Sequence, residues 1–148
     1  MSLSKKIVLA VPTETELIKN LTKAQNWIDL KNQEVVLVHF FPISHYMNEF
    51  TPYAFPDDSQ KVEIKASICK MLENVRDTLN LSKEKTTLIC EFTNSVRPDM
   101  VDFLKNQGAN LLILATRGKH GIPGLFDSSF AEYMNKYSPC DVLVLRPC

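Results

Sequence analysis

Short apolar runs alternate with longer amphipathic segments along the 148 residues of this chain. Several of the runs are apolar at consecutive positions, as in VVLV, LLIL and VLVL. A strand has this pattern when both faces of its sheet are covered, as in a parallel sheet. The pattern therefore predicts five parallel strands, at residues 6–11, 34–41, 86–92, 110–115 and 141–145.

The segments between these strands have the spacing of amphipathic helices with recognisable ends. Thr13 and Glu16 stand at capping-box spacing before the first helix, and Ser129 and Glu132 before the fourth. The second helix is expected to begin in the polar cluster at 57–59. The buried stripes expected on these three helices are Leu17, Leu21, Ala24 and Ile28; Val62, Cys69, Leu72, Val75 and Leu79; and Tyr133, Met134 and Tyr137.

The third helix is expected to begin near Pro98, which suits a first helical turn, and to stop at Gly108. Its apolar stripe is Met100, Val101 and Leu104. Strands and helices thus alternate throughout, which is typical of a doubly wound α/β fold. We expect one such domain over residues 1–148, because this length suits a single core.

One segment, residues 42–58, departs from the alternating pattern. It contains three prolines and five aromatic or methionine side chains, and it is longer than a usual loop. Its aromatic side chains would either pack on the domain's own helices or form a lid or an interface.

Composition excludes several function classes. Seventeen basic and seventeen acidic residues give a net charge of zero, so no long-range field favours nucleic acid or an anionic membrane. The apolar runs are far shorter than the ~18–20 residues that cross a bilayer. The run at 7–11 is too short for a signal peptide, and the four cysteines show no CxxC spacing. We therefore expect a cytoplasmic protein with reduced thiols and no bound metal.

Ligands of open parallel sheets bind at the carboxyl ends of the strands, where the winding reverses. After the fourth strand, Gly118, Gly121 and Gly124 lie within seven residues of one another, beside two basic side chains, Arg117 and Lys119. Glycines allow backbone N–H groups to approach a phosphate, and the helix that follows adds partial positive charge. The loop could hold an anion or be a simple turn, and it fits neither a Walker A motif nor GxGxxG.

Two parts of the chain resemble the universal stress protein family. They are KKIVLAVPTETE with the following EVVLVHFFP, and GANLLILATRGKHGIPGLFDSSFAEYMNKYSPCDVLVLRPC. The resemblance covers nearly the whole chain. It implies an adenine nucleotide alpha hydrolase-like fold with strand order 3-2-1-4-5, helices on both faces, and an adenine-nucleotide cleft between the first and fourth strands. It also implies a frequent two-fold dimer.

The family's ATP-binding signature, Gly-x2-Gly-x9-Gly-Ser/Thr, corresponds here to Ala115, Gly118, Ser128 and Ser129, so two glycines are replaced. Pro12 occupies the position of the family's first-strand aspartate. Loss of that charged acceptor costs roughly 1.5–3 kcal/mol, or one to two decades of affinity. Each replaced glycine adds about 1 kcal/mol if its position requires positive φ.

These considerations select candidate cofactor-binding residues and no catalytic or metal-binding ones. The candidates are Val11, Pro12, Thr13, His39, Phe40, Ala115, Arg117, Gly118, Lys119, Gly121, Ser128 and Ser129. ATP or AMP is the candidate ligand. The three histidines have no evident nucleophile and acid beside them, and His39 in an apolar strand fits a hydrogen-bonded core position.

Three hypotheses remain open. The first is a regulatory or protective binding module whose nucleotide site is eroded, and the second is a nucleotide-dependent switch that still binds ATP or AMP. The third, an enzyme of the same fold, has no motif to support it.

The last strand is expected at an edge of the sheet, with apolar side chains on both faces (Val142, Leu143, Val144 and Leu145). An exposed apolar edge tends to aggregate unless it is covered. Antiparallel pairing with the same strand of a second copy would cover it in a closed two-fold contact, so we expect a homodimer.

Overall fold

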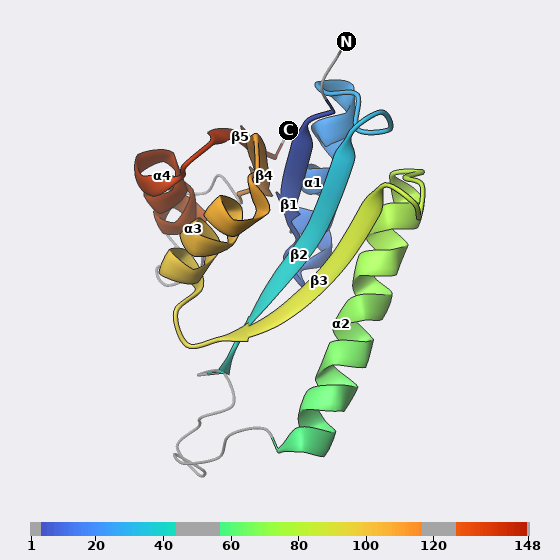
Figure 1. Ribbon diagram of the computed structural model, residues 1–148, viewed down its shortest axis with the longest axis vertical. Coiled ribbons are helices and arrows are strands. Elements are labelled where there is room, and N and C mark those ends of the chain that lie inside the picture. The colour runs from blue at the N-terminus through green and yellow to red at the C-terminus, as the bar shows by residue number, and fades with distance from the viewer. Residues whose placement is uncertain (1–3, 44–56, 117–126, 148) are drawn as a thin grey trace.

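The computed structural model describes residues 4–43, 57–116 and 127–147, and side chains in the last of these ranges from Phe130 onward. These ranges contain a five-stranded parallel sheet and its covering helices (Figure 1). The strands are β1 Lys6–Ala10, β2 Glu34–Pro42, β3 Thr86–Thr93, β4 Leu111–Ala115 and β5 Asp141–Leu145. The helices are α1 Thr15–Thr22, the 3-10 turn η1 Lys23–Asn26, α2 Asp58–Thr78, α3 Val96–Gln107 and α4 Asp127–Tyr137.

The strand order is β3-β2-β1-β4-β5, and every pairing is parallel. The expected fold class and strand order are therefore confirmed, and the strand bounds differ from the predicted ones by one residue at most. Because β1 adjoins both β2 and β4, the chain winds outward from it in both directions, which makes the β1/β4 boundary the topological switch point.

Successive side chains of the strands enter two separate cores. In β1, Ile7 and Leu9 belong to the core under α1 and α2, whereas Val8 belongs to the core under α3 and α4. Figure 1 shows α2 beside β3 on one side of the sheet and α3 and α4 on the other. The consecutive apolar residues of the sequence are explained by this arrangement, since both faces of each central strand exclude water.

Two of the expected helix ends are confirmed. Asp57 caps α2: its carboxylate accepts the backbone N–H of Gln60 at 2.8 Å, and the Gln60 side chain accepts the backbone N–H of Asp57 at 2.9 Å. Gly108 ends α3 in the left-handed conformation, at φ 63°, where a residue with a Cβ would be strained.

Two capping expectations were wrong, because each helix begins at a different residue. Helix α1 begins at Thr15, with Glu14 in the capping position and extended, so Thr13 and Glu16 do not form a capping box. Helix α4 begins at Asp127, which places Ser129 inside its first turn.

The buried stripe expected on α2 was partly wrong. Val62 is 68% exposed, whereas Ile68, Leu72 and Val75, in the later part of the helix, are buried. The first turns of α2 extend beyond the end of the strands in Figure 1, so an apolar residue there has no sheet to contact.

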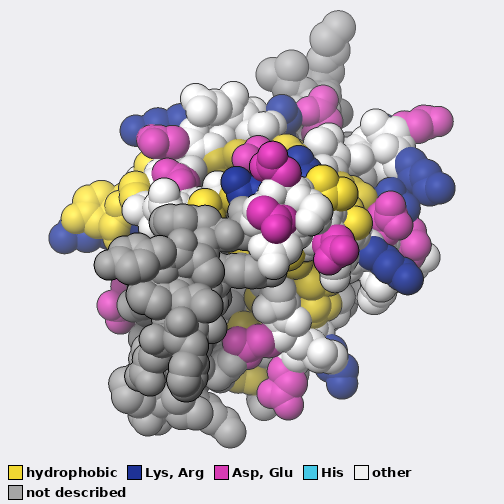
Figure 2. All heavy atoms as spheres, turned by 90° about the horizontal axis from the view of Figure 1, so that it is seen from below, with side chains coloured by type: hydrophobic (Ala, Val, Ile, Leu, Met, Phe, Trp, Pro, Cys, Tyr) yellow, Lys and Arg dark blue, Asp and Glu magenta, His cyan; other side chains and the backbone are white. Residues whose placement is uncertain are grey.

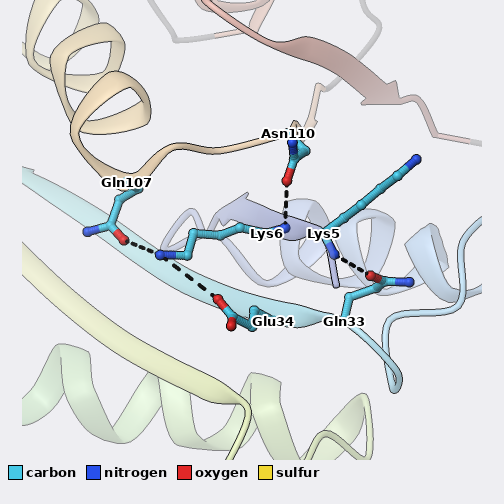
Figure 3. Close-up of polar contacts among 6 residues, drawn as sticks. All are labelled: Lys5, Lys6, Gln33, Glu34, Gln107 and Asn110. Atoms are coloured by element: carbon cyan, nitrogen blue, oxygen red, sulfur yellow. Dashed lines mark hydrogen bonds and ion pairs between the residues drawn. The ribbon is translucent and has the colours of Figure 1, made fainter. Parts of the chain in front are cut away.

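The amino ends of the strands are joined by a small polar network around Lys6 (Figure 3). Its backbone N–H donates to Oδ1 of Asn110 at 2.8 Å, and its ammonium group lies 3.4 Å from Oε1 of Gln107 and 4.0 Å from a carboxylate oxygen of Glu34. The network connects β1 to β2 and to the end of α3. It is largely exposed, so its ion pair contributes little to stability. No helix in the described ranges is long and apolar enough to cross a bilayer.

Substitution of Leu72, which is fully buried on α2, tests whether this helix holds its face of the sheet. We expect Leu72→Ala to lower the free energy of unfolding by about 2–5 kcal/mol in urea denaturation, because it leaves a cavity in the core. Val62→Ala on the same helix serves as the matched control and should change it by less than about 0.5 kcal/mol. Equal losses in the two variants would contradict the observed packing of α2.

Candidate functional site

A cavity of about 250 Å³ lies at the carboxyl ends of β1, β2 and β4, at the switch point of the sheet. The strand ends, the connection from β1 to α1, and the first turns of α3 and α4 all contribute to its wall. The residues that line it are Ala10, Val11, Pro12, Thr13, Glu14, Leu17, Val38, His39, Phe40, Phe41, Pro42, Val96, Met100, Leu114, Ala115 and Phe130.

The tip of β1 is tied to β2 by both polar groups of Val11. Its backbone N–H donates to the carbonyl oxygen of Val38 at 2.8 Å, and its carbonyl oxygen lies 2.7 Å from Nδ1 of His39. A carbonyl can only accept, so Nδ1 of His39 carries the proton and Nε2 holds a lone pair in the neutral ring. The backbone of Val11 therefore has a structural role at the cavity wall.

The His39 side chain is neutral at physiological pH. Burial lowers its pKa below the ordinary value of 6.5, and the hydrogen bond to Val11 opposes that shift only in part. The direction follows from desolvation, which disfavours the imidazolium form in an apolar setting.

The connection from β1 to α1 supplies most of the polar groups of the wall. Pro12 has no N–H to offer, whereas Thr13 is exposed and carries a hydroxyl. Glu14 is half-buried and occupies the capping position of α1 without a side-chain capping bond. A carboxylate is thus present at this wall, two residues beyond the position of Pro12.

The rest of the described wall is apolar. Val38 and Leu114 are buried on the neighbouring strands, and Met100 and Phe130 face the cavity from α3 and α4. Phe40 is held in place by an edge-to-face contact with Phe103, at 5.6 Å between ring centroids. An apolar wall with a few polar groups is typical of small-molecule pockets.

Six of the twelve candidate residues from the sequence lie together at this cavity: Val11, Pro12, Thr13, His39, Phe40 and Ala115. Arg117, Gly118, Lys119 and Gly121 lie outside the described residues. Ser128 and Ser129 belong to the first turn of α4, and their side chains are outside the described part of the chain. Most of the segment at 42–58 also lies outside it, although Pro42 ends β2 and Asp57 caps α2.

Sequence reasoning missed the wall residues of α3 and α4, together with Glu14 and Leu17 of the first connection. Glu14 directly follows a candidate residue and could have been included on that ground. Val96, Met100 and Phe130 gave no such indication, because their nearness to β1 depends on how the helices cross the sheet.

The one thiol beside His39 is unsuited to nucleophilic chemistry. Cys90 is the register partner of His39 on β3, and burial raises its pKa to about 11. The thiol is therefore protonated at neutral pH, whereas a reactive cysteine needs the thiolate. In the described ranges no group of three or more His, Cys, Asp or Glu side chains could hold a metal ion.

Figure 2 views the molecule from below, onto the end at which β2 finishes. Acidic and basic side chains are interspersed on this face, among apolar ones. This agrees with the net charge of zero and provides no field of one sign for a polyanion.

Titration of His39 should make stability depend on pH. Because its pKa is lower in the folded chain than in the unfolded chain, the unfolded state takes up the proton first as the pH falls below 6.5. The free energy of unfolding should therefore decrease below this pH, with a slope of at most about 1.4 kcal/mol per pH unit from this one group. Urea denaturation of wild type and His39→Asn between pH 7 and pH 5 measures the difference, and parallel pH profiles would contradict a buried neutral His39.

Solved structures share this architecture at low sequence identity. The universal stress protein UspA from Lactobacillus plantarum superposes with a TM-score of 0.67 at 15% identity, over 99% of this chain and 100% of that one. A universal stress protein in complex with cAMP gives a TM-score of 0.67 at 12% identity, over 99% and 100% of the two chains. One from Archaeoglobus fulgidus in complex with dAMP gives 0.61 at 14% identity, over 98% and 99%. At these identities the likeness establishes the fold.

Membership of a family rests on the sequence comparison. No significant match was found among curated proteins. The family model described as "Universal stress protein family" matches residues 4–146, which is nearly the whole chain. This chain therefore belongs to the universal stress protein family.

Proposed function

We propose that this chain is a regulatory or protective binding module whose cavity takes an adenine nucleotide, with a weakened hold on the nucleoside. The observation that carries the proposal is the cavity itself, which opens at the switch point between β1 and β4 and is lined from both sides of it. Two proteins of the same fold were solved in complex with cAMP and dAMP, and this supports the class of ligand.

The size of the cavity favours a single nucleoside unit. At about 250 Å³ it lies just below the ~300–1,000 Å³ of pockets for drug-sized ligands. An apolar wall suits the faces of a purine, while Thr13 and Glu14 offer acceptors for ribose hydroxyl groups. The phosphates would then leave the cavity toward the glycine-containing loop after β4, where Gly118, Lys119 and the start of α4 are the proposed contacts.

The weakened hold follows from Pro12. A carboxylate at this position would accept hydrogen bonds from the ligand, and proline supplies neither that acceptor nor a backbone donor. Glu14 lines the same cavity and replaces part of the missing charge, from a different position. The proposed module therefore binds nucleotide more weakly than an otherwise identical site with aspartate at position 12.

Substitution of Pro12 tests this proposal. Isothermal titration calorimetry with AMP and ATP should show binding that Pro12→Asp tightens by about 10- to 100-fold, the effect of one charged hydrogen bond. Pro12→Ala restores the N–H without the carboxylate, and we expect it to bind within about threefold of wild type. Absence of binding in both wild type and Pro12→Asp would overturn the proposal.

The edge strand supports a second proposal, a homodimer. In the described part of the sheet β5 pairs only with β4. The carbonyl oxygen of Leu145 accepts from the N–H of Thr116, which follows β4, so Leu143 and Leu145 direct their backbone groups inward. Since this direction alternates along a strand, Val142 and Val144 present theirs at the open edge.

Those outward groups would pair antiparallel with β5 of a second copy, and this pairing covers an edge that is apolar on both faces. Light scattering after gel filtration should then give about twice the chain mass of 16.9 kDa. Val144→Pro removes an outward donor without touching the β4 ladder and should give a monomer, whereas Val144→Thr keeps the donor and the dimer. A wild-type monomer at micromolar concentration would reject the pairing.

A further inference from the structure

The ring of His39 has one nitrogen committed and one available. Nδ1 donates to the carbonyl oxygen of Val11 at 2.7 Å, which ties β2 to the tip of β1 and fixes the ring. Among the described residues this is the hydrogen bond that the structure records for the ring. Nε2 is therefore an oriented acceptor on a side chain that lines the cavity.

The surroundings of His39 ask for a donor from the ligand. The N–H of Val11 is used by Val38, and Pro12 has none, so neither residue at the tip of β1 can donate to a ligand from its backbone. Lysine and arginine do not occur among the described residues of the wall, and Glu14 is its other titratable group. A ligand atom that meets His39 must therefore carry its own proton.

The position of His39 within the cavity points to the base of a nucleotide. Its neighbours along β2 are Val38, Phe40 and Phe41, and the ring of Phe41 lies 6.4 Å from its own, centroid to centroid, in an edge-on arrangement. The hydroxyl of Thr13 and the carboxylate of Glu14 belong to the connection after β1. A purine fits the apolar side and a ribose the polar side.

We propose that Nε2 of His39 accepts a hydrogen bond from the exocyclic amino group of the adenine ring, which makes His39 a specificity-determining residue of the cavity. This inference rests on the proposed function, because it assumes that an adenine nucleotide enters the cavity. Burial lowers the pKa of His39 and so keeps Nε2 unprotonated at physiological pH. The acceptor then comes from the side chain of β2, and the first strand need not provide it.

Deletion of single ligand groups tests the contact. AMP is compared by calorimetry with purine riboside 5′-monophosphate, which lacks only the amino group, and with 2′-deoxy-AMP, which lacks only a ribose hydroxyl. Each titration is made with wild type and with Pro12→Asp, so that a weak wild-type site does not hide the comparison. We expect AMP to bind about tenfold more tightly than purine riboside 5′-monophosphate.

Two substitutions of His39 form the matched pair. In His39→Asn the short amide can donate to Val11 in place of Nδ1, but no atom remains at the position of Nε2. In His39→Gln the longer amide carries an oxygen to the position of Nε2 and loses the bond to Val11. We expect the preference for AMP to fall to about onefold in His39→Asn and to return in part in His39→Gln.

The outcomes separate this inference from the proposed function. If no nucleotide binds in either background, the proposed function fails and the inference with it. If AMP and purine riboside 5′-monophosphate bind equally well, the inference alone is wrong. The same holds if His39→Asn keeps the preference for AMP, or if His39→Asn abolishes a preference for AMP over 2′-deoxy-AMP instead.

A measurement on the wild-type ring guards against a variant that fails to fold. In ¹⁵N-histidine spectra, Nε2 of His39 should have the shift of an unprotonated nitrogen and move toward that of a hydrogen-bonded one when AMP is added. Purine riboside 5′-monophosphate should leave it in place. An Nε2 that carries the proton in the free protein would overturn the inference directly.

Discussion

The central strand β1 is enclosed on every side: β2 and β4 bond its backbone, and two separate cores take its alternate side chains. No part of its length faces water, so polar chemistry can occur only at its ends. At the amino end Lys6 is joined to β2 and to the end of α3 by an exposed polar network. At the carboxyl end the chain must turn away under one face of the sheet while β4 sends its own connection under the other, and the cavity lies between them.

The polar groups at that end are largely used by the fold itself. Both backbone groups of Val11 bond to β2, and one of these bonds is made by the His39 side chain. Pro12 then withholds an N–H from the next position. The wall is left with acceptors, on Thr13, Glu14 and His39, and with apolar surface from four other elements. Such a wall distinguishes ligands by the donors that they carry and by their fit to the apolar surface.

Local patterns failed where two local solutions had equal merit. Thr13 and Glu16 have the spacing of a capping box, yet Glu14 remains extended at ψ 128° and the helix begins at Thr15. In α2 the same apolar stripe continues from Val62 to Leu79, but the sheet covers only the later turns. Periodicity reports which side of a helix is apolar, whereas burial depends on how far the neighbouring layer extends.

The sequence by itself determined the fold class, the five strands and the family, because consecutive apolar residues in short runs are stable only between two covering layers. It also placed Pro12, His39 and Ala115 at strand ends, where a doubly wound sheet puts its ligand site. Only the tertiary structure decided that Glu14, Met100 and Phe130 share a wall with them, and that Nδ1 of His39 is the nitrogen already bonded. Contacts of that kind depend on the crossing of helices over the sheet and on the rotamer of one ring, and neither leaves a periodic trace along the chain.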